Sequence, residues 1–390
     1  MSVWQTKPLG DVLQLNYGKS LPVKNRVDGP IPVYGSNGIV GSHNEAIVDQ
    51  PGLIVGRKGS AGQVHRSLGP FCPIDTTFYV TAKDAPDTDL EFLFYLLSHI
   101  DLTRITGDVG VPGLNREMAY MEPVHFPEAL PEQKKIAHIL STVQRAIEMQ
   151  ERIIQVTAEL KKALMHKLFT EGLRNEPQKQ TEIGPVPESW EVVELGDVAK
   201  IERGKFSHRP RNEPRFYGGA YPFVQTGDVS NCDGYVRSYT QTLNEDGLAI
   251  SKMFPAGTIL ITIAANIGFT GILEFDSACP DSLIGISPNE NVQTEFLNYY
   301  LITQQPEMDR LAPKGTQKNI NIQFLKPWPV PLPSVEEQTE IAEAFSATYR
   351  KIRLANQKRI QLQDLFRTLL HELMTANTRV NEIELSTSNS

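Results

Sequence analysis

Lysine and arginine gather in four short segments of a chain that is acidic as a whole. The 390 residues contain 38 Lys and Arg against 46 Asp and Glu, a formal net charge of −8. Residues 200–215 nevertheless carry six Lys and Arg against two Glu, and residues 310–326 carry four cations and no acidic residue. Such local groups can neutralise the phosphates of a nucleic acid. The overall acidity excludes a generally basic nucleic-acid coat protein but leaves local DNA-binding surfaces open.

The first half of the chain has two smaller cationic groups. One follows Gly18, and the other spans 57–66 beside three glycines, whose backbone allows a phosphate to approach closely. Together with the groups of the second half, they predict phosphate contacts from both halves. The residues are Lys19, Lys24 and Arg26 in the first half and Lys205 and Lys314 in the second.

Base reading needs side chains that match base edges in the major groove. Arg pairs there with guanine, and Asn or Gln pairs with adenine. Any one of these residues can equally be a solvated surface residue, so the groups carry more weight than their members. Tyr34 and Phe206 could pack on a sugar or base, but a core position is an equally good interpretation. The base-reading candidates are Asn37, Arg57, Lys58 and Arg116 in the first half and Arg209, Arg211, Gln225, Asn266, Lys318 and Asn319 in the second.

Catalytic and cofactor motifs are missing from the sequence. No GxGxxG opens a helix after a strand, and none of the eight His has HExxH spacing. Residues 18–20 end like a phosphate-binding loop, but Leu13 stands where that loop requires its first glycine. We therefore expect no catalytic residue, no metal and no cofactor in this chain.

Histidine and cysteine, the usual transition-metal ligands, form no spaced cluster. His166 and His371 match in the repeat described below and could form a metal pair, but a positive charge near a helix C-terminus is the simpler interpretation. Cys72, Cys232 and Cys279 are odd in number and lack CxxC spacing, which disfavours disulfides and a four-thiolate zinc site. No apolar run approaches the roughly 20 residues that span a bilayer, and the start lacks a secretory signal. We expect a reduced, cytosolic protein.

A long internal repeat organises the chain. Three groups of residues recur in the same order, at offsets of 186, 204 and 205. The offset grows between residues 20 and 90, so the second copy carries extra residues there. The pattern predicts one structural unit present twice. The matches include Trp4, Leu9-Gly10-Asp11-Val12 and Gly18-Lys19 with Trp190, Leu195-Gly196-Asp197-Val198 and Gly204-Lys205, and Glu132-Gln133 with Glu337-Gln338.

Each copy begins with a mixed stretch and ends in a long helix. Short apolar runs at 53–55 and 259–263 predict buried strands, and the segments 88–99 and 293–304 predict short amphipathic helices. The second part of each copy contains neither Pro nor Gly over about 40 residues, which predicts a helix roughly 60 Å long.

The two long helices carry apolar stripes that need a partner. Ser334 and Glu337 form a capping-box pattern at the start of the second helix. Antiparallel pairing of the two helices as a coiled coil is favoured over packing of each helix on its own domain. The stripe of the first helix comprises Ile136, Leu140, Val143, Ile147, Ile154, Leu160, Leu164 and Leu168, and that of the second comprises Ile341, Phe345, Ile352, Phe366, Leu369 and Leu373.

Three features together resemble a known family. The Leu-Gly-Asp-Val start occurs in both halves, residues 314–320 read KGTQKNI just before a Pro-rich strand, and PEQKKIA at 131–137 and EEQTEIA at 336–342 open the long helices. This arrangement resembles the specificity subunit of type I restriction-modification systems. The resemblance covers nearly the whole chain, in the family's domain order.

The resemblance implies an α+β fold with two pseudo-repeated mixed α/β target-recognition domains, separated by two long antiparallel helices that form a coiled coil. Each domain would read one half of a bipartite, asymmetric double-stranded DNA target. Two modification subunits would dock on the helices and perform adenine methylation with S-adenosylmethionine, and restriction subunits can join them. The chain lacks the Asn/Asp-Pro-Pro-aromatic loop of such methyltransferases, which agrees with a non-catalytic role.

The expected domain boundaries follow the repeat and the helices. The domains are 1–130 and 190–335 for target recognition, 131–172 and 336–376 for the long helices, 173–189 for a linker and 377–390 for a flexible tail.

Two other functions stay open on the sequence alone. The chain could be a coiled-coil scaffold for protein partners, or a small-molecule enzyme with a site between its duplicated domains. The enzyme would need a convergent set of titratable residues, which no spacing supplies. The basic groups near glycines argue against the scaffold, and steep salt dependence would distinguish a DNA reader from it.

Overall fold

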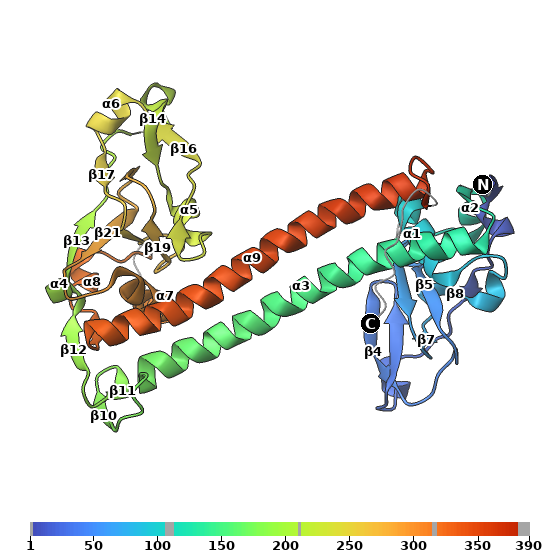
Figure 1. Ribbon diagram of the computed structural model, residues 1–390, viewed down its shortest axis with the longest axis horizontal. Helices are drawn as coiled ribbons and strands as arrows, with labels where there is room; N and C mark the ends of the chain where they lie inside the picture. The colour runs from blue at the N-terminus through green and yellow to red at the C-terminus, as the bar shows by residue number, and fades with distance from the viewer. Residues whose placement is uncertain (1–2, 106–112, 210–211, 314–317, 381–390) are drawn as a thin grey trace. The chain divides into compact units, whose positions relative to one another are not determined.

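The computed structural model describes residues 3–105, 113–209, 212–313 and 318–380. They form two compact units (Figure 1). The first unit comprises Met1–Gln150 with Lys358–Ser390, and the second comprises Glu151–Gln357. Each unit therefore contains one mixed domain and parts of both long helices.

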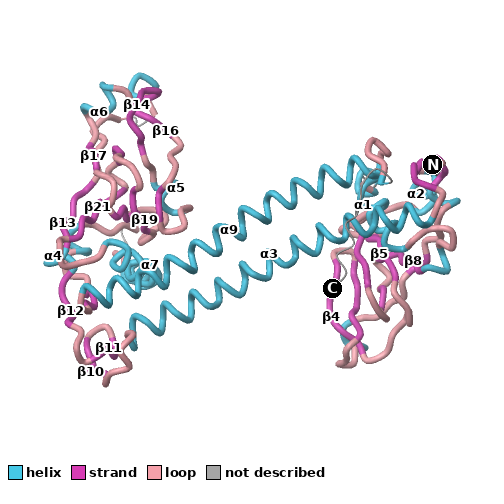
Figure 2. The backbone as a smooth tube through the Cα atoms, viewed as in Figure 1, coloured by secondary structure: helices cyan, strands magenta, loops and turns pink. Residues whose placement is uncertain are grey.

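Short strands build three small sheets in the described part of the first unit (Figure 2). Their orders are β2-β8-β5-β6, β4-β3-β7 and β1-β9. The apolar run predicted at 53–55 is confirmed as β5, which has a neighbour on each side and is buried at all five positions. The strands are β1 (Trp4–Pro8), β2 (Asn16–Tyr17), β3 (Ile31–Gly35), β4 (Gly38–His43), β5 (Gly52–Gly56), β6 (Val64–Ser67), β7 (Cys72–Pro73), β8 (Thr77–Thr81) and β9 (Pro123–Pro127).

The described part of the second unit repeats this plan with larger sheets. The orders are β13-β21-β18-β19-β15, β16-β14-β20-β17, β12-β22 and β10-β11. The predicted strand at 259–263 is β18, again fully buried between two neighbours. The strands are β10 (Gln178–Thr181), β11 (Gly184–Pro187), β12 (Glu191–Glu194), β13 (Ala199–Arg203), β14 (Tyr217–Phe223), β15 (Tyr235–Val236), β16 (Gln241–Leu243), β17 (Lys252–Phe254), β18 (Ile259–Thr262), β19 (Thr270–Leu273), β20 (Ser277–Cys279), β21 (Leu283–Pro288) and β22 (Pro329–Leu332).

The extra residues of the second copy extend both of its larger sheets. Strands β13, β21, β18 and β19 follow the order of β2, β8, β5 and β6, and β15 is added at the edge. In the other sheet, β17 is added beyond β20. The short helices α5 (Thr226–Ser230) and α6 (Glu245–Ala249) lie in the same part of the chain. The growth in offset between the copies is thereby explained.

Both predicted short helices are present. The segment 88–99 corresponds to α1 (Leu90–Ile100), whose first turn is capped by the Asp89 carboxylate. The segment 293–304 corresponds to α7 (Thr294–Leu311), which is longer than predicted and continues past Pro306. The other short helices are α2 (Arg116–Met121), α4 (Leu195–Val198), α8 (Ile322–Leu325), η1 (Leu9–Asp11), η2 (Val23–Asn25), η3 (Ala82–Asp84), η4 (Leu102–Ile105) and η5 (Pro214–Phe216).

The long helices are α3 (Leu130–Glu171) and α9 (Val335–Met374), close to their predicted bounds. In the second unit, the end of α3 contacts the start of α9: the Phe169 and Phe345 rings stack with centroids 5.4 Å apart. In the first unit, Ile136 near the start of α3 shares a hydrophobic core with Leu373 near the end of α9. Each unit thus shows the order of contacts that antiparallel helices require. Leu160, predicted in the apolar stripe, is 50% exposed.

The recurring Glu-Gln pair at the start of each long helix has a structural explanation. In the first unit, Gln133 accepts a hydrogen bond from the Asp89 N–H (2.8 Å) and donates one to the Pro127 carbonyl (2.9 Å). In the second unit, Gln338 accepts from the Gln293 N–H (2.8 Å) and donates to a proline carbonyl (3.0 Å). Both Gln side chains are fully buried. The pair therefore joins each long helix to the mixed domain of its own unit.

The segments after the long helices are more ordered than predicted. The expected linker 173–189 contains the β10-β11 hairpin, which buries Val186 against the core of the second unit. The expected tail begins with residues that pack: Arg379 pairs with the buried Glu132 (3.1 Å), and Val380 is 2% exposed. The partner of Arg379 lies 247 residues away in the sequence, and the strands of the hairpin are short and Pro-rich, so neither segment carries a strong local signal. Residues 381–390 lie outside the described part.

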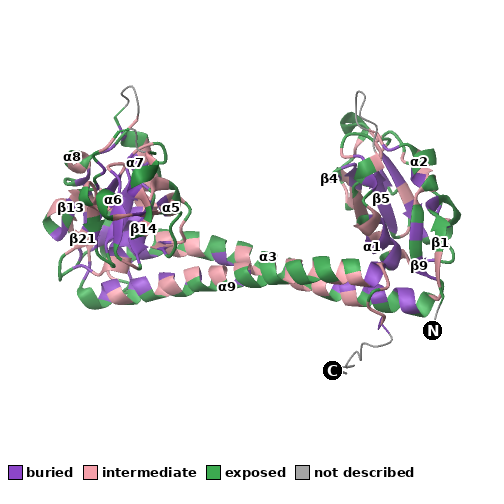
Figure 3. Ribbon diagram, turned by 90° about the horizontal axis from the view of Figure 1, so that it is seen from above, coloured by how far each residue is buried: buried purple, intermediate pink, exposed green. Residues whose placement is uncertain are grey.

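Burial separates the cores of the units from their surfaces (Figure 3). β5 in the first unit and β14 in the second are among the elements with buried residues. The three cysteines are free, and burial raises the pKa of Cys232 to about 11. None of the helices in the described ranges combines the length and apolar character that crossing a bilayer requires.

Candidate nucleic-acid interface

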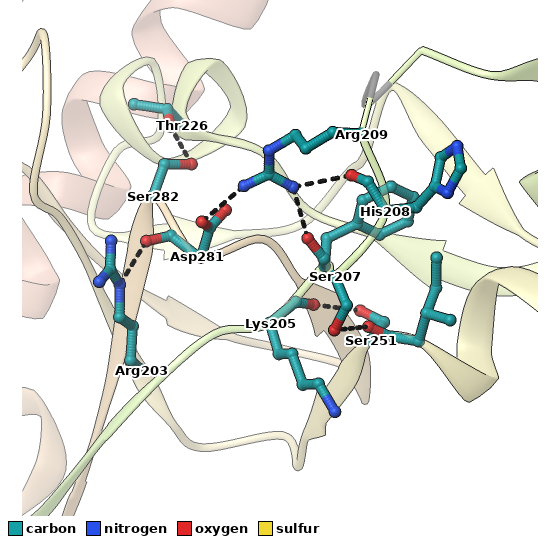
Figure 4. Close-up of polar contacts among 11 residues, drawn as sticks. Arg203, Lys205, Ser207, His208, Arg209, Thr226, Ser251, Asp281 and Ser282 are labelled. Atoms are coloured by element: carbon teal, nitrogen blue, oxygen red, sulfur yellow. Dashed lines mark hydrogen bonds and ion pairs between the residues drawn. The ribbon is translucent and has the colours of Figure 1, made fainter.

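A four-residue segment before β21 holds two candidate residues of the second unit, Lys205 and Arg209, together with Arg203 (Figure 4). Lys205 donates its backbone N–H to the Cys279 carbonyl (2.9 Å), and Arg203 donates its Nε–H to the Asp281 carbonyl (2.7 Å). Arg209 forms an ion pair with the Asp281 carboxylate (2.8 Å). We call residues 279–282 the second anchor segment. Its carbonyls and carboxylate place three cationic residues side by side.

The same arrangement occurs in the first unit at residues 73–76, the first anchor segment. Lys19 donates its backbone N–H to the Pro73 carbonyl (2.9 Å). Arg57 donates its Nε–H to the Asp75 carbonyl (3.1 Å) and its backbone N–H to the Thr76 carbonyl (2.8 Å). The two anchor segments are 206 residues apart, so the repeat extends to individual backbone hydrogen bonds.

The glycine before each anchored lysine is required by close packing. A Cβ at Gly18 would lie 2.0 Å from the Ile74 carbonyl oxygen, and one at Gly204 would lie 2.2 Å from that of Pro280. No side chain fits at such distances. The repeated Gly-Lys pair is therefore a backbone docking feature, with the lysine side chain left exposed in both copies.

A second loop in each unit contacts the strand end that the anchor segment holds. In the first unit, Leu114 donates its N–H to the Arg57 carbonyl (2.9 Å), which brings Arg116 to the same edge. In the second unit, Ile320 donates to the Ile263 carbonyl (3.0 Å), and Asn319 pairs with Ala264 through a backbone bridge. Three of the predicted base readers, Arg57, Lys58 and Arg116, are thus together in the first unit, and Asn266 and Asn319 belong to adjoining loops in the second.

The side chains at equivalent backbone positions differ between the copies. Tyr17 precedes Gly18 in the first copy, and Arg203 precedes Gly204 in the second. Arg57 and Arg116 correspond to Ile263 and Ile322 by the matching backbone hydrogen bonds. The sequence-based candidates omitted Tyr17 and Arg203, although their shared place before the Gly-Lys pair could have revealed them.

Other candidates contact their own chain. Arg26 donates to the carbonyls of Leu21 (3.2 Å) and Val40 (2.7 Å), which holds the loop around η2. Lys318 forms an ion pair with Asp309 (2.8 Å). These contacts occupy part of the donor capacity of Arg26 and Lys318 and hold both side chains toward their own chain.

The remaining candidates are placed as follows. Asn37 is exposed directly after Ser36, whose hydroxyl donates to the Thr76 carbonyl of the first anchor segment (2.6 Å). Gln225 donates to Gln241 and precedes Thr226, which hydrogen-bonds Ser282 of the second anchor segment (3.2 Å). Lys24 is exposed in η2 and distant along the chain from the first anchor segment. Tyr34 and Phe206 are buried in the cores. Arg211 and Lys314 lie outside the described residues. His166 and His371 belong to different units.

One acidic residue near the second anchor segment is neutralised locally. Hydrogen bonds from Lys252 and then from Lys200 lower the pKa of Glu202. Both contacts are short, at 2.8 and 3.0 Å. Glu202 therefore stays ionised and balances Lys252 and Lys200, of which only Lys200 belongs to the charge count of the segment 200–215.

A match to a protein-family model shows which family has this architecture. The family model of the type I restriction modification DNA specificity domain matches residues 1–158 and 187–364. The chain belongs to this family. Specificity subunits recognise DNA, and the catalytic activities of their complexes belong to the partner subunits. The interpretation as a small-molecule enzyme is therefore wrong.

Individual relatives agree with the family. The type I restriction enzyme MjaVIII specificity subunit of Methanocaldococcus jannaschii is 27% identical over 410 residues, covering 97% of this chain and 94% of its own. The putative MjaX specificity subunit of the same organism is 30% identical over 295 residues, covering 74% and 68%.

A solved structure shows the same fold. The S subunit of a type I restriction-modification system from M. genitalium superposes with a TM-score of 0.72, covering 95% of this chain and 96% of its own at 17% identity. The α+β specificity-subunit fold expected from the sequence is confirmed.

Proposed function

We propose that this specificity subunit reads an asymmetric, bipartite DNA sequence, one half with each mixed domain. The observation that carries the proposal is the pair of anchor segments. The same backbone hydrogen bonds recur 206 residues apart, yet they hold Tyr17 and Arg57 in one copy and the exposed Arg203 in the other, where the position of Arg57 is taken by the buried Ile263. A common frame with different side chains would read two different half-sites, because base edges are distinguished by the donors and acceptors placed against them.

Phosphate contacts would come from the exposed cations around each frame. Lys19 and Lys205 have anchored backbones and exposed side chains in equivalent positions. They can approach the DNA backbone without sequence preference, so they would fix the register while other residues read bases. Arg26 and Lys318 would keep their internal partners.

The long helices would set the gap between the half-sites. We propose that α3 and α9 pair as an antiparallel coiled coil, which the contact order within each unit supports. A rigid spacer imposes one separation, and DNA presents the same face only about every 34–36 Å. Two modification subunits carrying S-adenosylmethionine would dock on these helices in the cytosol, and restriction subunits can join.

Methylation mapping tests the proposal directly. The full chain is co-expressed with its modification subunit in a host without adenine methylation, and methylated adenines are mapped across the genome. We expect a single motif of two short specified sequences around an unspecified gap of fixed length. Methylation at one continuous sequence, or no sequence-specific methylation, would contradict the proposal.

A further inference from the structure

The first domain contains two arginines that share one exposed aromatic ring. The Cζ atoms of Arg57 and Arg116 lie 5.3 and 5.0 Å from the centroid of the Tyr17 ring. Tyr17 is 51% exposed and rests against Phe78, with ring centroids 5.0 Å apart. A tyrosine so exposed contributes little to the core. Its contacts instead fix the direction of two guanidinium groups, which stack well on aromatic faces.

The two arginines differ in the donors that remain available. Arg57 donates from both Nε and Nη2 to the Asp75 carbonyl, so its guanidinium is tied to the first anchor segment. The Nε atom of Arg116 is buried without a hydrogen-bond partner among the described residues, and a Glu117 carboxylate oxygen lies 3.5 Å away. The guanidinium of Arg116 is therefore held by two rings and by one long ion pair with Glu117, with no carbonyl acceptor among the described residues.

A second ring, that of Tyr120, also contacts the guanidinium of Arg116. Its Cζ atom lies 5.8 Å from the Tyr120 ring centroid, and the Tyr120 hydroxyl accepts a hydrogen bond from the Leu15 N–H (2.9 Å). A Cβ at Gly10 would lie 2.9 Å from the Tyr120 Cβ, so the glycine of the Leu-Gly-Asp-Val start leaves room for this ring. The repeated motif thus supports the platform under Arg116.

We propose that Arg116 reads a guanine in the half-site of the first domain, and that Tyr17 and Arg57 position it. This inference rests on the proposed function and names one base contact within it. A planar guanidinium whose terminal N–H groups have no acceptor among the described residues matches the O6 and N7 acceptors of guanine, and preorganisation on two rings reduces the freedom lost on binding. The second domain reads its half-site differently, because isoleucines stand at both equivalent positions.

The test maps methylated adenines genome-wide for the full chain co-expressed with its modification subunit, comparing wild type with Arg116→Gln. We expect the wild-type motif to contain guanine in the first domain's half-site. Arg116→Gln should relax that position, with discrimination against other bases falling about tenfold, while the other half-site and the gap stay unchanged. Arg104→Gln, which removes an exposed arginine paired with Glu122 in the same domain, is the matched control and should leave the motif intact.

Two further variants separate base reading from a structural role. Tyr17→Phe keeps the ring and should preserve the motif, whereas Tyr17→Leu should weaken discrimination at the same base without choosing a new one. If Arg116→Gln abolishes methylation altogether, Arg116→Lys decides: its ammonium still reaches guanine O6 and N7 but lacks the planar fork, so methylation should return with guanine kept at that position, and a rescued motif that specifies another base there would overturn the inference. An unchanged motif in Arg116→Gln would overturn it as well. A wild-type complex without a bipartite motif would instead refute the proposed function.

Discussion

Trp190 donates its indole N–H to the carboxylate of Glu337, 3.2 Å away across 147 residues of sequence. Trp4 makes the same contact with Glu132 at 3.3 Å. Glu337 is 3% exposed and also accepts from the Leu173 N–H at 2.8 Å. The capping box predicted at Ser334 is therefore only half present: the serine hydroxyl accepts from the Glu337 N–H, but the carboxylate bonds elsewhere. The buried Glu337 carboxylate thus joins the start of α9 to Leu173, just after α3, and to Trp190 at the start of the second domain.

Glu337→Ala should destabilise the second unit by about 2–3 kcal/mol, because it leaves the indole N–H and the Leu173 N–H without their acceptor. Chemical denaturation followed by tryptophan fluorescence measures the effect. Glu336→Ala, at an exposed neighbouring position, is the control and should change the free energy of unfolding by less than about 0.5 kcal/mol. Equal effects of the two substitutions would contradict the role given to Glu337.

Gly204→Ala should cost about 2 kcal/mol or more and impair reading of the second half-site. Its Cβ would lie 2.2 Å from the Pro280 carbonyl oxygen, so β13 and the second anchor segment would have to separate. Gly227→Ala is a matched control, since its Cβ would enter open space. Thermal denaturation and methylation mapping of both variants check this, and a Gly204→Ala protein as stable as the control would show that the close packing is wrong.

Lys19→Gln should weaken DNA binding to a similar extent for all sequences. The lost phosphate contact should also lower the slope of log affinity against log salt by about one. Binding by the complex with its modification subunits is measured at several salt concentrations. Lys83→Gln, an exposed lysine in η3, should leave the slope unchanged. A change in base preference rather than in the salt slope would argue for base reading by Lys19.

Lowering the pH should destabilise the first unit because of the buried His99 side chain. Burial, and secondarily the nearby His371, lower the pKa of His99. The folded state therefore binds this proton less tightly than the unfolded state. The contribution of His99 to the free energy of unfolding is fully present above the ordinary histidine pKa of about 6.5. It is lost as the pH falls toward the lower pKa that His99 has in the folded protein. His99→Gln should flatten the pH dependence of unfolding between pH 7.5 and 5.5, whereas His166→Gln, exposed on α3, should not. Parallel curves for wild type and His99→Gln would refute this.

Lengthening both long helices should change the gap between half-sites. Seven residues inserted after Gln150 and seven after Gln357, where the chain passes between the two units, add two helical turns or about 10.5 Å. This length corresponds to about three base pairs at 3.4 Å each. Methylation mapping should show a longer gap with the same half-sites, or loss of methylation. An unchanged gap would show that the helices do not act as the spacer.

The sequence predicted the helices well because their signals are local. The absence of Pro and Gly and the apolar spacing placed α3 and α9 within two residues of their bounds. The Pro-rich hairpin at 178–187 was missed, because it depends on contacts of Val186 with distant residues. Strand order and the added strands of the second copy likewise depend on tertiary pairing.

The candidate site was predicted less completely for the same reason. Composition revealed Arg57 and Arg116 but gave no reason to join them, because they meet on Tyr17, which lies 40 residues before one and 99 before the other. Charge counting also could not tell the exposed Lys19 from Arg26, whose donors are used by two carbonyls of its own loop. Whether a cationic side chain remains available to contact DNA therefore depends on partners that are distant in the sequence.

The anchor segments hold their surroundings through main-chain hydrogen bonds, through two glycines that tolerate no side chain, and through arginine side chains that donate to the Asp75 and Asp281 carbonyls. Of the residues that differ between the copies, Tyr17 and Arg203 are exposed, whereas Ile263, the counterpart of Arg57, is 1% exposed and belongs to the core of the second unit. Exchange at 17 or 203 should therefore cost the scaffold little stability, whereas an arginine at 263 would be a buried, unpaired charge. On the proposed function, substitution at the exposed positions beside one anchor segment would change one half-site while the other domain keeps its preference.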